Sequence, residues 1–567
     1  MIIKAGNKSL IIDYITTAKK LFGIDEMRAF GDIYLSINKE EKGSGAVYTP
    51  LEISSYMVKN TITAEALINN PYIRIIDPAC GTGNLLRPFY DELYSLYMEN
   101  VQAINNKNVL SLNPESIPEH ICKFNLEGYD IDDFALKILS IDLFNKSGFC
   151  PSNIFNKDFL FLDETLDVDI IISNPPYIGH KAIGIEYGRE LKKSFSSIYL
   201  DKGDISYCFF YKALEQLKHK GKITIITSRY FIESPSGRGL RKLLKDNFKI
   251  NKIVDFYGIR PFKNIGIDPV ILFLEKENVS DFQIKVIKPR GNTKKVNFIS
   301  GINKFEETYY KEYFVEQSQL IDDGWRLIDE REKTIVDKIE ANCKVSLDNI
   351  SDSFQGIITG CDKAFIVNKD TIETCRLEKD IIKPWIKSSF IKNDKVNLGD
   401  SYLLYTNLID DENKYNNTLS HLSDYKDKLL QRRECRSGKL SWYQLQWGRK
   451  SSIFEGEKII FPYKGEKNNF VYDKGSYFSA DIYSLILKEG TGYTYDFLIF
   501  ILNSKLYNFY FKTFGKKLGE KMYEYYPSYI SKIMVPEERE FASFTEDELY
   551  RYFGLSEDEV ELINGYN

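Results

Sequence analysis

The chain has 567 residues, of which 43% are hydrophobic and 28% charged, and its formal net charge is −5. This composition is typical of a globular protein and excludes disorder throughout. At roughly 150 residues per domain, the length predicts about two to four domains. The negative net charge excludes a simple polycation that coats nucleic acid, although it permits a local basic patch.

Metal, secretion and membrane signals are missing from the sequence. The eight cysteines are scattered without a CxxC pair, and the chain has only four histidines. Because zinc sites need clustered Cys and His ligands, we expect no metal. No apolar run reaches the roughly 18 residues of a membrane span, and the N-terminus lacks a cleavable signal. These features predict a cytoplasmic protein with reduced thiols and no membrane partner.

Two helix signals lie near the N-terminus. An amphipathic stretch, Leu10 to Leu21, predicts a helix that we interpret as a packing appendage within residues 1–40. Further on, Thr49-Pro50-Leu51-Glu52 has the pattern of a capping box, with Thr49 as N-cap and Glu52 at the third helical position. A second helix is therefore expected to begin near residue 50.

Between about residues 72 and 275, apolar strand-like runs alternate with amphipathic helices. Such alternation predicts an α/β fold, a doubly wound and mostly parallel sheet with helices on both faces. Ligands of these sheets bind at the carboxyl ends of the strands. The expected strands are Ile73–Ile76, Leu126–Tyr129, Val168–Ser173, Ile223–Thr227, Ile253–Phe256 and Val270–Leu274.

Beyond about residue 295 this alternation is lost, and short strand-like pieces, turns and aromatic residues dominate. All four tryptophans lie in this part of the chain. We place a boundary near the turn Pro289–Asn292. The expected organisation is a helical appendage at 1–40, an α/β domain at 41–294 and an α+β domain at 295–567.

Glycine and acidic residues follow the first expected strands. The turn DPACGTGN at 77–84 carries two glycines that let the backbone approach a ligand. Asp130 ends the second strand, where a carboxylate can accept hydrogen bonds from ribose hydroxyls. Asp158 could accept an adenine amino group and Phe159 could cover the base. Each feature alone also fits a tight turn, a helix cap or core packing.

The most informative segment is Asp169–Tyr177, which places Asn174, Pro175 and Pro176 at the end of a buried strand. Two consecutive prolines remove two backbone donors and stiffen the loop, so carbonyl groups and the Asn174 amide oxygen remain as acceptors. Such a site suits an amino group. Tyr177 beside it offers a ring on which a planar base or amide can stack.

The order of these motifs resembles that of the S-adenosylmethionine-dependent N6-adenine DNA methyltransferases of the gamma class. In that class the YTP segment precedes the glycine turn, and a target-recognition domain follows the catalytic domain. Segments 354–365 and 442–449 resemble signatures of this recognition domain. The resemblance covers nearly the whole chain, and within the class it is closest to the clostridial, sporulation-associated orphan enzymes.

The resemblance implies S-adenosylmethionine as cofactor and assigns roles to the motif residues. Thr49 would lie near the carboxylate of the cofactor, Asp130 on its ribose and Asp158 on its adenine amine. The full set of implied cofactor contacts is Tyr48, Thr49, Pro50, Asp77, Ala79, Gly81, Asp130, Ile131, Asp158, Phe159 and Asn174.

The resemblance also implies that the target adenine is flipped out of the duplex. Tyr177 and Phe262 would stack on its two faces, while Asn174 and the Pro175 carbonyl accept the hydrogens of its amine. The implied catalytic set is Asn174, Pro175, Pro176, Tyr177 and Phe262.

Double-stranded DNA is the expected partner, at an A-rich and non-palindromic site that a monomer could read. Residues 426–450 contain eight basic and two acidic residues, and phosphate contacts dominate affinity for DNA. A solvated helix face is the alternative for each of these charges. The candidate contacts are Gln355, Thr359, Lys363, Arg432, Arg433, Arg436, Trp442, Tyr443, Arg449, Lys516 and Lys517.

Other functions fit the sequence less well. An NPPY-type enzyme acting on a protein glutamine or an RNA amine would not need the upstream YTP segment or the long C-terminal domain. A bifunctional restriction enzyme would need a nuclease domain, for which too few residues precede Tyr48. A C5-cytosine enzyme would need a Pro-Cys nucleophile loop, and no cysteine here follows a proline. The intact 174–177 loop also disfavours a DNA-binding module without catalysis.

Overall fold

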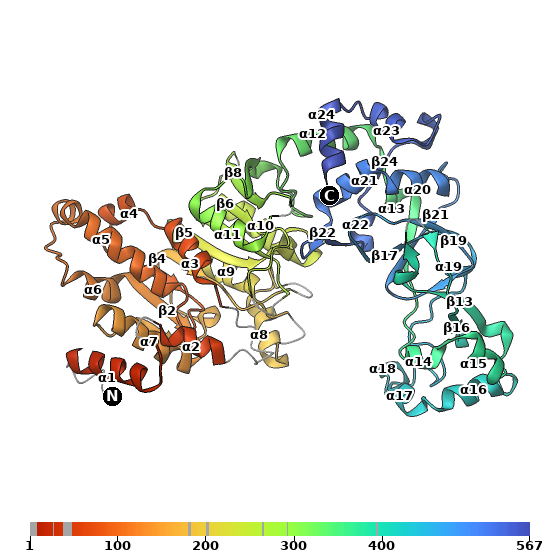
Figure 1. Ribbon diagram of the computed structural model, residues 1–567, viewed down its shortest axis with the longest axis horizontal. Coiled ribbons are helices and arrows are strands. Elements are labelled where there is room, and N and C mark those ends of the chain that lie inside the picture. Colours follow the sequence, from red (N-terminus) through yellow and green to blue (C-terminus); the bar gives the residue numbers. More distant parts are fainter. Residues whose placement is uncertain are drawn as a thin grey trace. The chain divides into compact units, whose positions relative to one another are not determined.

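The computed structural model describes residues 8–25, 28–37, 48–179, 183–199, 203–262, 266–279, 281–291, 293–392 and 395–566. The chain forms two compact units, Met1–Asp329 and Glu330–Asn567 (Figure 1). Among the described helices, none is long and apolar enough to cross a bilayer.

The first unit is built on one sheet. Its strands are β1 (Ile75–Asp77), β2 (Leu126–Asp130), β3 (Ile154–Asn156), β4 (Val168–Ser173), β5 (Leu217–Ser228), β6 (Lys249–Asp255), β7 (Pro269–Glu275), β8 (Gln283–Pro289) and β9 (Tyr310–Glu316). The described strands lie in the order β3-β2-β1-β4-β5-β7-β6-β8-β9. Strands β1 to β5 pair in parallel, as do β6 and β8, whereas β7 and β9 are antiparallel to their neighbours. The predicted doubly wound, mostly parallel sheet is confirmed.

Each of the six expected strands overlaps an observed strand, and β8 and β9 extend the sheet beyond them. Residues Gln283–Pro289 pair along their whole length with Tyr310–Glu316. The sheet therefore continues past the boundary expected at 294/295, and the first unit ends at Asp329 instead. The reason is that β9 is an edge strand with one partly exposed face, so it lacks the continuous apolar run that marked the other strands.

Helices cover the sheet on both faces. The helices of this unit are α1 (Lys8–Leu21), α2 (Phe30–Ile37), α3 (Leu51–Lys59), α4 (Ala64–Asn69), α5 (Leu86–Asn108), α6 (Ile117–His120), α7 (Asp133–Ser147), α8 (Ile185–Ser194), α9 (Ser206–Gln216), α10 (Arg238–Asn247) and α11 (Lys295–Lys304). Ile75, Ile170 and Ile172 share a core with α3, α5, α7 and α11, whereas Ile76 and Ile171 share another with α9 and α10. Successive strand residues point to opposite faces, so both faces are buried.

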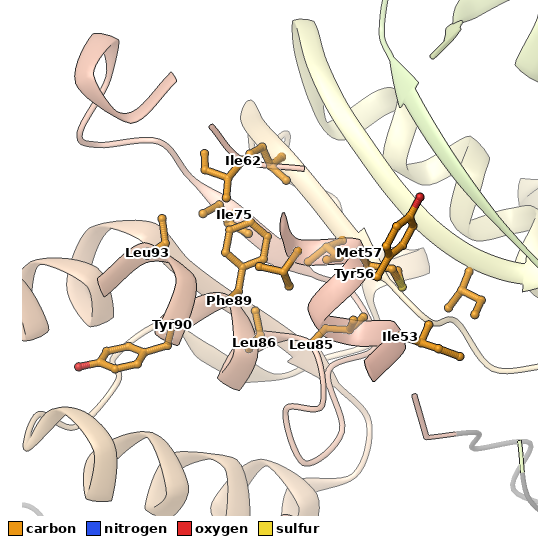
Figure 2. Close-up of a cluster of buried hydrophobic side chains, with 14 of the residues drawn as sticks. Ile53, Tyr56, Met57, Ile62, Ile75, Leu85, Leu86, Phe89, Tyr90 and Leu93 are labelled. Carbon is orange, nitrogen blue, oxygen red and sulfur yellow. The ribbon is translucent and has the colours of Figure 1, made fainter. Parts of the chain in front are cut away.

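The core between α3, α5 and β1 supports the loops that follow β1. Figure 2 shows Ile53 and Met57 of α3 together with Leu86 and Phe89 of α5 and Ile75 of β1 in one buried cluster. All five side chains have no exposed surface. Burying a side chain of this size contributes roughly 1.5–3 kcal/mol. This packing fixes the start of α3 and the glycine turn relative to β1.

The N-terminal helices belong to the first unit and do not form a unit of their own. Helix α1 spans the expected stretch from Leu10 to Leu21, so this helix is confirmed. At the start of α2, the amides of Phe30 and Gly31 both donate to the buried Asp142 carboxylate of α7, at 2.8 Å. These two bonds attach α2 to α7, one of the helices that pack on the sheet.

Helix α3 begins at Leu51, as expected, but the predicted capping box is wrong. Pro50 occupies the N-cap position, and among the described residues no side chain caps the first turn. The Pro50 carbonyl accepts the first helical bonds, from Ile53 and Ser54. The hydroxyl of Thr49 points elsewhere, because it accepts a hydrogen bond from Asn174.

The second unit combines small sheets with short helices. Its strands are β10 (Val345–Ser346), β11 (Ser351–Gln355), β12 (Ile366–Val367), β13 (Ile382–Ile386), β14 (Ile391–Lys392), β15 (Lys395–Val396), β16 (Tyr402–Leu404), β17 (Glu457–Pro462), β18 (Lys464–Gly465), β19 (Val471–Lys474), β20 (Tyr477–Phe478), β21 (Ile482–Leu487), β22 (Lys516–Leu518), β23 (Met522–Glu524) and β24 (Met534–Val535). The larger sheets have the orders β11-β21-β17-β19, β12-β16-β13-β20 and β18-β23-β22. Two-stranded pairs β10-β24 and β14-β15 complete the set.

Helices surround these sheets, in agreement with the expected α+β class. They are α12 (Glu330–Asn342), α13 (Leu347–Ile350), α14 (Asp362–Phe365), α15 (Lys369–Thr374), α16 (Asn416–Ser423), α17 (Lys426–Leu430), α18 (Arg433–Arg436), α19 (Ser452–Glu455), α20 (Tyr495–Asn503), α21 (Lys505–Phe514), α22 (Pro527–Ile530), α23 (Glu546–Tyr552) and α24 (Glu557–Gly565). One core of this unit contains Trp385, Phe365 and Tyr477, all nearly fully buried.

The turn after β1 depends on a glycine at position 83. Gly83 has φ +82°, and an added Cβ would overlap Cδ1 of Leu139. We expect Gly83→Ala to lower the free energy of unfolding by about 2–4 kcal/mol, because left-handed strain and overpacking add. Gly81 has φ +49°, but its nearest atom would be 3.6 Å away, so Gly81→Ala should show the backbone effect alone. Urea unfolding of the two variants tests this, and equal losses would contradict the steric explanation.

Candidate active site and nucleic-acid interface

Three strands bring the predicted catalytic and cofactor residues to one edge of the sheet. Asp77 ends β1, Asp130 ends β2, and Asn174 directly follows β4. Because β1 pairs in parallel with both β2 and β4, the carboxyl ends of the three strands are neighbours. This is the edge at which doubly wound sheets bind their ligands.

The glycine turn is hydrogen-bonded to Asp130. The Gly81 amide donates to Oδ2 of Asp130 at 2.8 Å, and the Asp132 amide donates to Oδ1 at 2.9 Å. A Cβ at Gly81 would face the ring of Tyr48 at 3.6 Å, so the glycine leaves space at the turn. Burial raises the pKa of Asp130. Each carboxylate oxygen has a second lone pair with which to accept another donor, such as a sugar hydroxyl.

The two apolar residues expected against the adenine ring lie in opposite environments. Ile131 is 77% exposed next to Asp130, so its side chain is available to a ligand. Phe159 is only 1% exposed, and its ring packs against Tyr129 and Phe209 with centroid distances of 5.8 and 6.3 Å. Phe159 therefore supports the loop from the core, which is the packing role that the sequence had left open.

Both carboxylate oxygens of Asp158 have partners. The Leu160 amide donates to Oδ1 at 3.0 Å, and the Tyr187 hydroxyl donates to Oδ2 at 2.9 Å. Burial and the neighbouring carboxylate raise the pKa of Tyr187, which keeps its hydroxyl a donor. Sequence reasoning missed Tyr187, because it lies on α8 and belongs to none of the motifs.

Asp77 lies beneath the glycine turn. It is 1% exposed and accepts a hydrogen bond from the Ala79 amide at 3.1 Å. Burial, reinforced by the charge of Asp130, raises the pKa of Asp77 to about 8. The side chain is therefore mostly protonated at neutral pH, which fits a buried carboxyl group that has no cationic partner among the described residues.

The amide group of Asn174 is held at both ends. Its Nδ2 donates to Oγ1 of Thr49 at 3.0 Å, and its Oδ1 accepts from the Tyr177 hydroxyl at 2.6 Å. The Tyr177 hydroxyl also lies 3.2 Å from the carbonyl oxygen of Ile226, and burial raises its pKa well above the ordinary value. Two motifs separated by 125 positions in the sequence thus meet at one side chain.

The rings of Tyr177 and Phe262 contact each other. Their centroids are 6.2 Å apart with a tilt of 49°, and Phe262 is 5% exposed. A base stacked between them would need parallel rings about 7 Å apart, twice a carbon contact distance of ~3.5 Å. The expected sandwich therefore requires the two rings to separate from the positions they occupy here.

A buried group of charges, which the sequence did not reveal, stabilises the neighbouring strand ends. Arg229 pairs with Asp255 at 2.9 Å and with Glu233 at 2.6 Å. Asp255 ends β6 and also accepts from the Tyr257 amide at 2.8 Å, which fixes the start of the loop that carries Phe262. Within the described part of the chain, no three His, Cys, Asp or Glu side chains are arranged to hold a metal ion.

In the second unit, segments 354–365 and 442–449 lie together. Ile358 and Trp447 exchange backbone hydrogen bonds of 3.2 and 2.9 Å. The Arg449 guanidinium donates to Oε1 of Gln355 at 3.1 Å and lies 5.5 Å from the Trp447 ring centroid. Trp447 is 48% exposed and Arg449 is exposed as well. An exposed ring beside a cation suits contacts with bases and phosphates, and Trp447 was not among the predicted contacts.

Arg432 needs a correction as a predicted DNA contact. It is 9% exposed, and its guanidinium donates to the carbonyl oxygens of Leu429, Thr359, Gln444 and Trp442 at 2.7–3.2 Å. Its charge therefore satisfies buried backbone acceptors and joins the two segments. This role could not be read from a sequence in which Arg432 appears as one basic residue among many.

The other candidate contacts divide between surface and interior. Thr359, Tyr443 and Lys517 are buried, which favours structural roles for these three. Lys516 is half-buried and pairs with Glu524 at 2.8 Å. Gln355 and Trp442 are half-buried. The exposed members are Lys363, Arg433, Arg436 and Arg449.

Comparison with known proteins agrees with a methyltransferase-type sheet followed by a specificity domain. Residues 105–262 match the Eco57I restriction-modification methylase family, and residues 383–535 match the TaqI-like C-terminal specificity domain. The fold is also similar to that of the type IIL restriction-modification enzyme MmeI, solved in complex with DNA. That similarity has a TM-score of 0.59 at 14% identity and covers 95% of this chain and 76% of the other.

Two relatives match along most of their length. Type II methyltransferase M.BanIII of Aneurinibacillus aneurinilyticus is 24% identical, over 88% of this chain and 90% of that protein. Type II methyltransferase M.BstVI of Geobacillus stearothermophilus is 23% identical, over 89% and 92%. The restriction enzyme and methyltransferase RM.Eco57I of Escherichia coli is 25% identical, but only 41% of its length matches. The chain is thus similar to type II restriction-modification methyltransferases over most of its length.

The raised pKa of Asp77 predicts how the stability of the fold depends on pH. Between its ordinary pKa of 3.8 and the folded value of about 8, the folded state binds a proton that the unfolded state has lost. Stability therefore falls as pH rises through this range. We expect Asp77→Asn to lessen this decline, as measured by urea unfolding at pH 5 and pH 8. Identical pH slopes for the variant and the wild type would refute the assignment.

The structural role of Arg432 can be tested on stability. We expect Arg432→Met to lower the free energy of unfolding of the second unit by about 2–4 kcal/mol, because buried carbonyl groups lose a charged donor. The exposed Arg433 provides the matched control, and Arg433→Met should change stability by less than about 0.5 kcal/mol. Denaturant unfolding measures both, and similar values for the two variants would speak against the role.

Proposed function

We propose that this protein is a site-specific DNA methyltransferase that transfers the methyl group of S-adenosylmethionine to N6 of adenine. The observation that carries the proposal is the Asn174 amide, fixed between Thr49 and Tyr177. It follows β4, at the sheet edge where Asp130 and the glycine turn lie. The methylase and specificity-domain matches support DNA methylation as the general activity.

The residues at the sheet edge fit S-adenosylmethionine. Asp130 can accept both ribose hydroxyls, the exposed Ile131 can pack on the adenine ring, and Asp158 can accept its amino group. The space left by the missing Cβ of Gly81 can receive the methionine part. The cofactor supplies an electrophilic methyl group on a positively charged sulfur.

The residues around Asn174 would prepare the target amine. The N6 lone pair of adenine is delocalised into the ring and is a weak nucleophile. When Oδ1 of Asn174 and the carbonyl of Pro175 accept the two N6 hydrogens, the nitrogen becomes pyramidal and its lone pair is free to attack. The N–CH3 bond forms as the S–CH3 bond breaks, and the nitrogen then loses one proton to solvent. Positioning and preorganised acceptors supply the catalysis.

Reaching the adenine amine requires the base to leave the duplex, at a cost of a few kcal/mol. Stacking of the base on Tyr177 would offset this cost by roughly 1–3 kcal/mol. Phe262 would stack on the second face of the base once the two rings separate. The second unit would hold the DNA, with Trp447 and Arg449 near the bases and Arg433, Arg436 and Lys363 near phosphates. The TaqI-like match favours DNA over an RNA or glutamine amine.

We also propose the class of the enzyme, the kind of site it reads and its oligomeric state. The order of YTP segment, glycine turn and Asn-Pro-Pro-Tyr loop supports the gamma class, and we propose an A-rich, non-palindromic site read by a monomer. We also propose that the protein acts on DNA in the cytoplasm as a methyltransferase without its own nuclease, in the manner of the orphan enzymes that its motifs resemble.

Methyl transfer to unmethylated genomic DNA tests the proposal directly. We expect the wild-type protein to place labelled methyl from S-adenosylmethionine in N6-methyladenine, as identified by nucleoside analysis. Asn174→Ala should reduce the rate at least about 100-fold, because it removes an acceptor made for the reacting amine. Asn100→Ala is the control, since the Asn100 amide donates to Leu96 within α5. Label in protein or RNA, or N4-methylcytosine alone, would overturn the assignment.

A further inference from the structure

We propose that Arg449 is a specificity-determining residue, whose guanidinium reads a guanine within the methylation site. This inference rests on the proposed function and deepens it, because it names one base pair that the site must contain. Its basis is an exposed guanidinium that neighbouring groups of the second unit hold in one orientation. A surface arginine is ordinarily mobile, whereas a side chain that discriminates between bases has to be preorganised.

The Arg449 guanidinium is bound along one of its edges. Its Nε donates to the carbonyl oxygen of Gly356 at 3.4 Å, and its Nη2 donates to Oε1 of Gln355 at 3.1 Å. The guanidinium carbon also lies 5.5 Å from the ring centroid of Trp447, within the range of a cation–π interaction. These three contacts fix the plane of the guanidinium, although the side chain is exposed to solvent.

The two acceptors of Arg449 belong to rigid structure. Gln355 ends β11, which pairs with β21 along its whole length, and its own Nε2 donates to the carbonyl oxygen of Ala480 at 3.1 Å. The amide is thus held at both ends, which keeps its Oε1 directed at Arg449. Gly356 lies close to the neighbouring chain, since an added Cβ would be 2.2 Å from the carbonyl oxygen of Ser479. Gln355 is therefore a positioning residue for Arg449.

The backbone at Arg449 adopts a conformation that side chains rarely allow. Its φ is +60°, in the left-handed region. Its carbonyl oxygen accepts a hydrogen bond of 2.7 Å from the hydroxyl of Tyr405, a residue that is 2% exposed. Strained backbone of this kind persists only where surrounding contacts hold it, and it is concentrated at functional sites. The fold thus sets the direction in which the side chain leaves the surface.

The opposite edge of the guanidinium is open to a ligand. Two hydrogens on Nη1 and one on Nη2 have no acceptor among the residues that the structure describes. One hydrogen from each nitrogen points in the same direction, so the pair matches two acceptors on one side of a planar group. In the major groove of DNA, O6 and N7 of guanine form such a pair, and arginine on guanine is the commonest specific contact.

A phosphate group also offers paired oxygens, but the rigidity of Arg449 favours a base. Phosphate contacts carry no sequence information and act mainly through charge, so a mobile side chain can make them. Discrimination between bases requires donors in fixed positions, because a donor that can turn also satisfies the acceptors of a wrong base. The contacts that hold Arg449 supply this fixed position.

Selection of bound duplexes from a randomised DNA pool, followed by sequencing, measures the base preference at each position of the site. For the wild type we expect one position that requires a guanine, in either strand. Arg449→Lys keeps the positive charge but loses the paired donors. It should lower the preference for guanine at that position roughly 10- to 100-fold and leave the other positions unchanged. The salt dependence of binding should also stay the same, because no charge is lost.

Gln355→Leu tests the positioning role. Leucine has a similar size but cannot accept a hydrogen bond from Arg449 or donate one to Ala480. We expect the preference for guanine to fall at the same position while affinity for random DNA is retained, since the charge of Arg449 remains. A merely structural loss would instead weaken binding to every sequence. Gln355→Glu keeps an acceptor for Arg449 and should retain the preference.

Arg376 provides a matched control in the same unit. It too has a left-handed backbone, with φ +52°, and its carbonyl oxygen accepts a hydrogen bond from Nδ2 of Asn417 at 2.9 Å. It lies outside the segments 354–365 and 442–449. Arg376→Lys should therefore alter neither the base preference nor the affinity for DNA. Circular dichroism melting of each variant shows whether it is folded.

The outcomes separate this inference from the proposed function. A wild-type site without a required guanine would overturn the reading role, as would Arg449→Lys binding every sequence equally weakly, which is the behaviour of a phosphate contact. The same loss of preference in folded Arg376→Lys would overturn it too. Selection of the guanine by a wild-type protein that methylates no DNA would overturn the proposed function and leave the reading role in place. A wild-type protein that selects no sequence would overturn both.

Discussion

The parallel register of β2, β1 and β4 is the constraint on which the site depends. Pairing of Ile75 with both Leu126 and Ile170 aligns three strands, so that Asp77, Asp130 and Asn174 emerge at one edge. Burial of both faces of the sheet makes this register strict, since a slip by one residue would turn every core side chain to the opposite face. The geometry of the candidate site thus follows from the same packing that stabilises the unit.

Buried polar groups then fix the orientation of the residues that the strand register brings together. Asp77 remains beneath the turn with a raised pKa, Asp130 bonds to the Gly81 amide, and the Asn174 amide lies between two hydroxyl groups. Low local polarity makes such hydrogen bonds strong and their loss costly. In the second unit, the buried guanidinium of Arg432 likewise donates hydrogen bonds to two segments and holds them together. Other residues of these segments are exposed at the surface.

The sequence predicted much of this organisation. Alternating apolar runs located six strands and the two faces of the sheet, and short motifs located the residues at the strand ends. It placed the domain boundary too early, because the half-exposed edge strand β9 has no continuous apolar run. It also assigned Thr49 to a helix cap that does not form. Tyr187 and the Arg229 charge group carried no motif, so local sequence gave no means of finding them.

The sequence by itself determined the α/β class, the strand-end residues and the character of the Asn-Pro-Pro-Tyr loop, because periodicity and proline chemistry are local properties. Only the tertiary structure decided which residues meet. Contact between Thr49 and Asn174 spans 125 positions, and burial separates the structural Arg432 from the exposed Arg433 next to it. Such distinctions depend on solvent exposure and on partners distant in the chain, which the residue type alone does not encode.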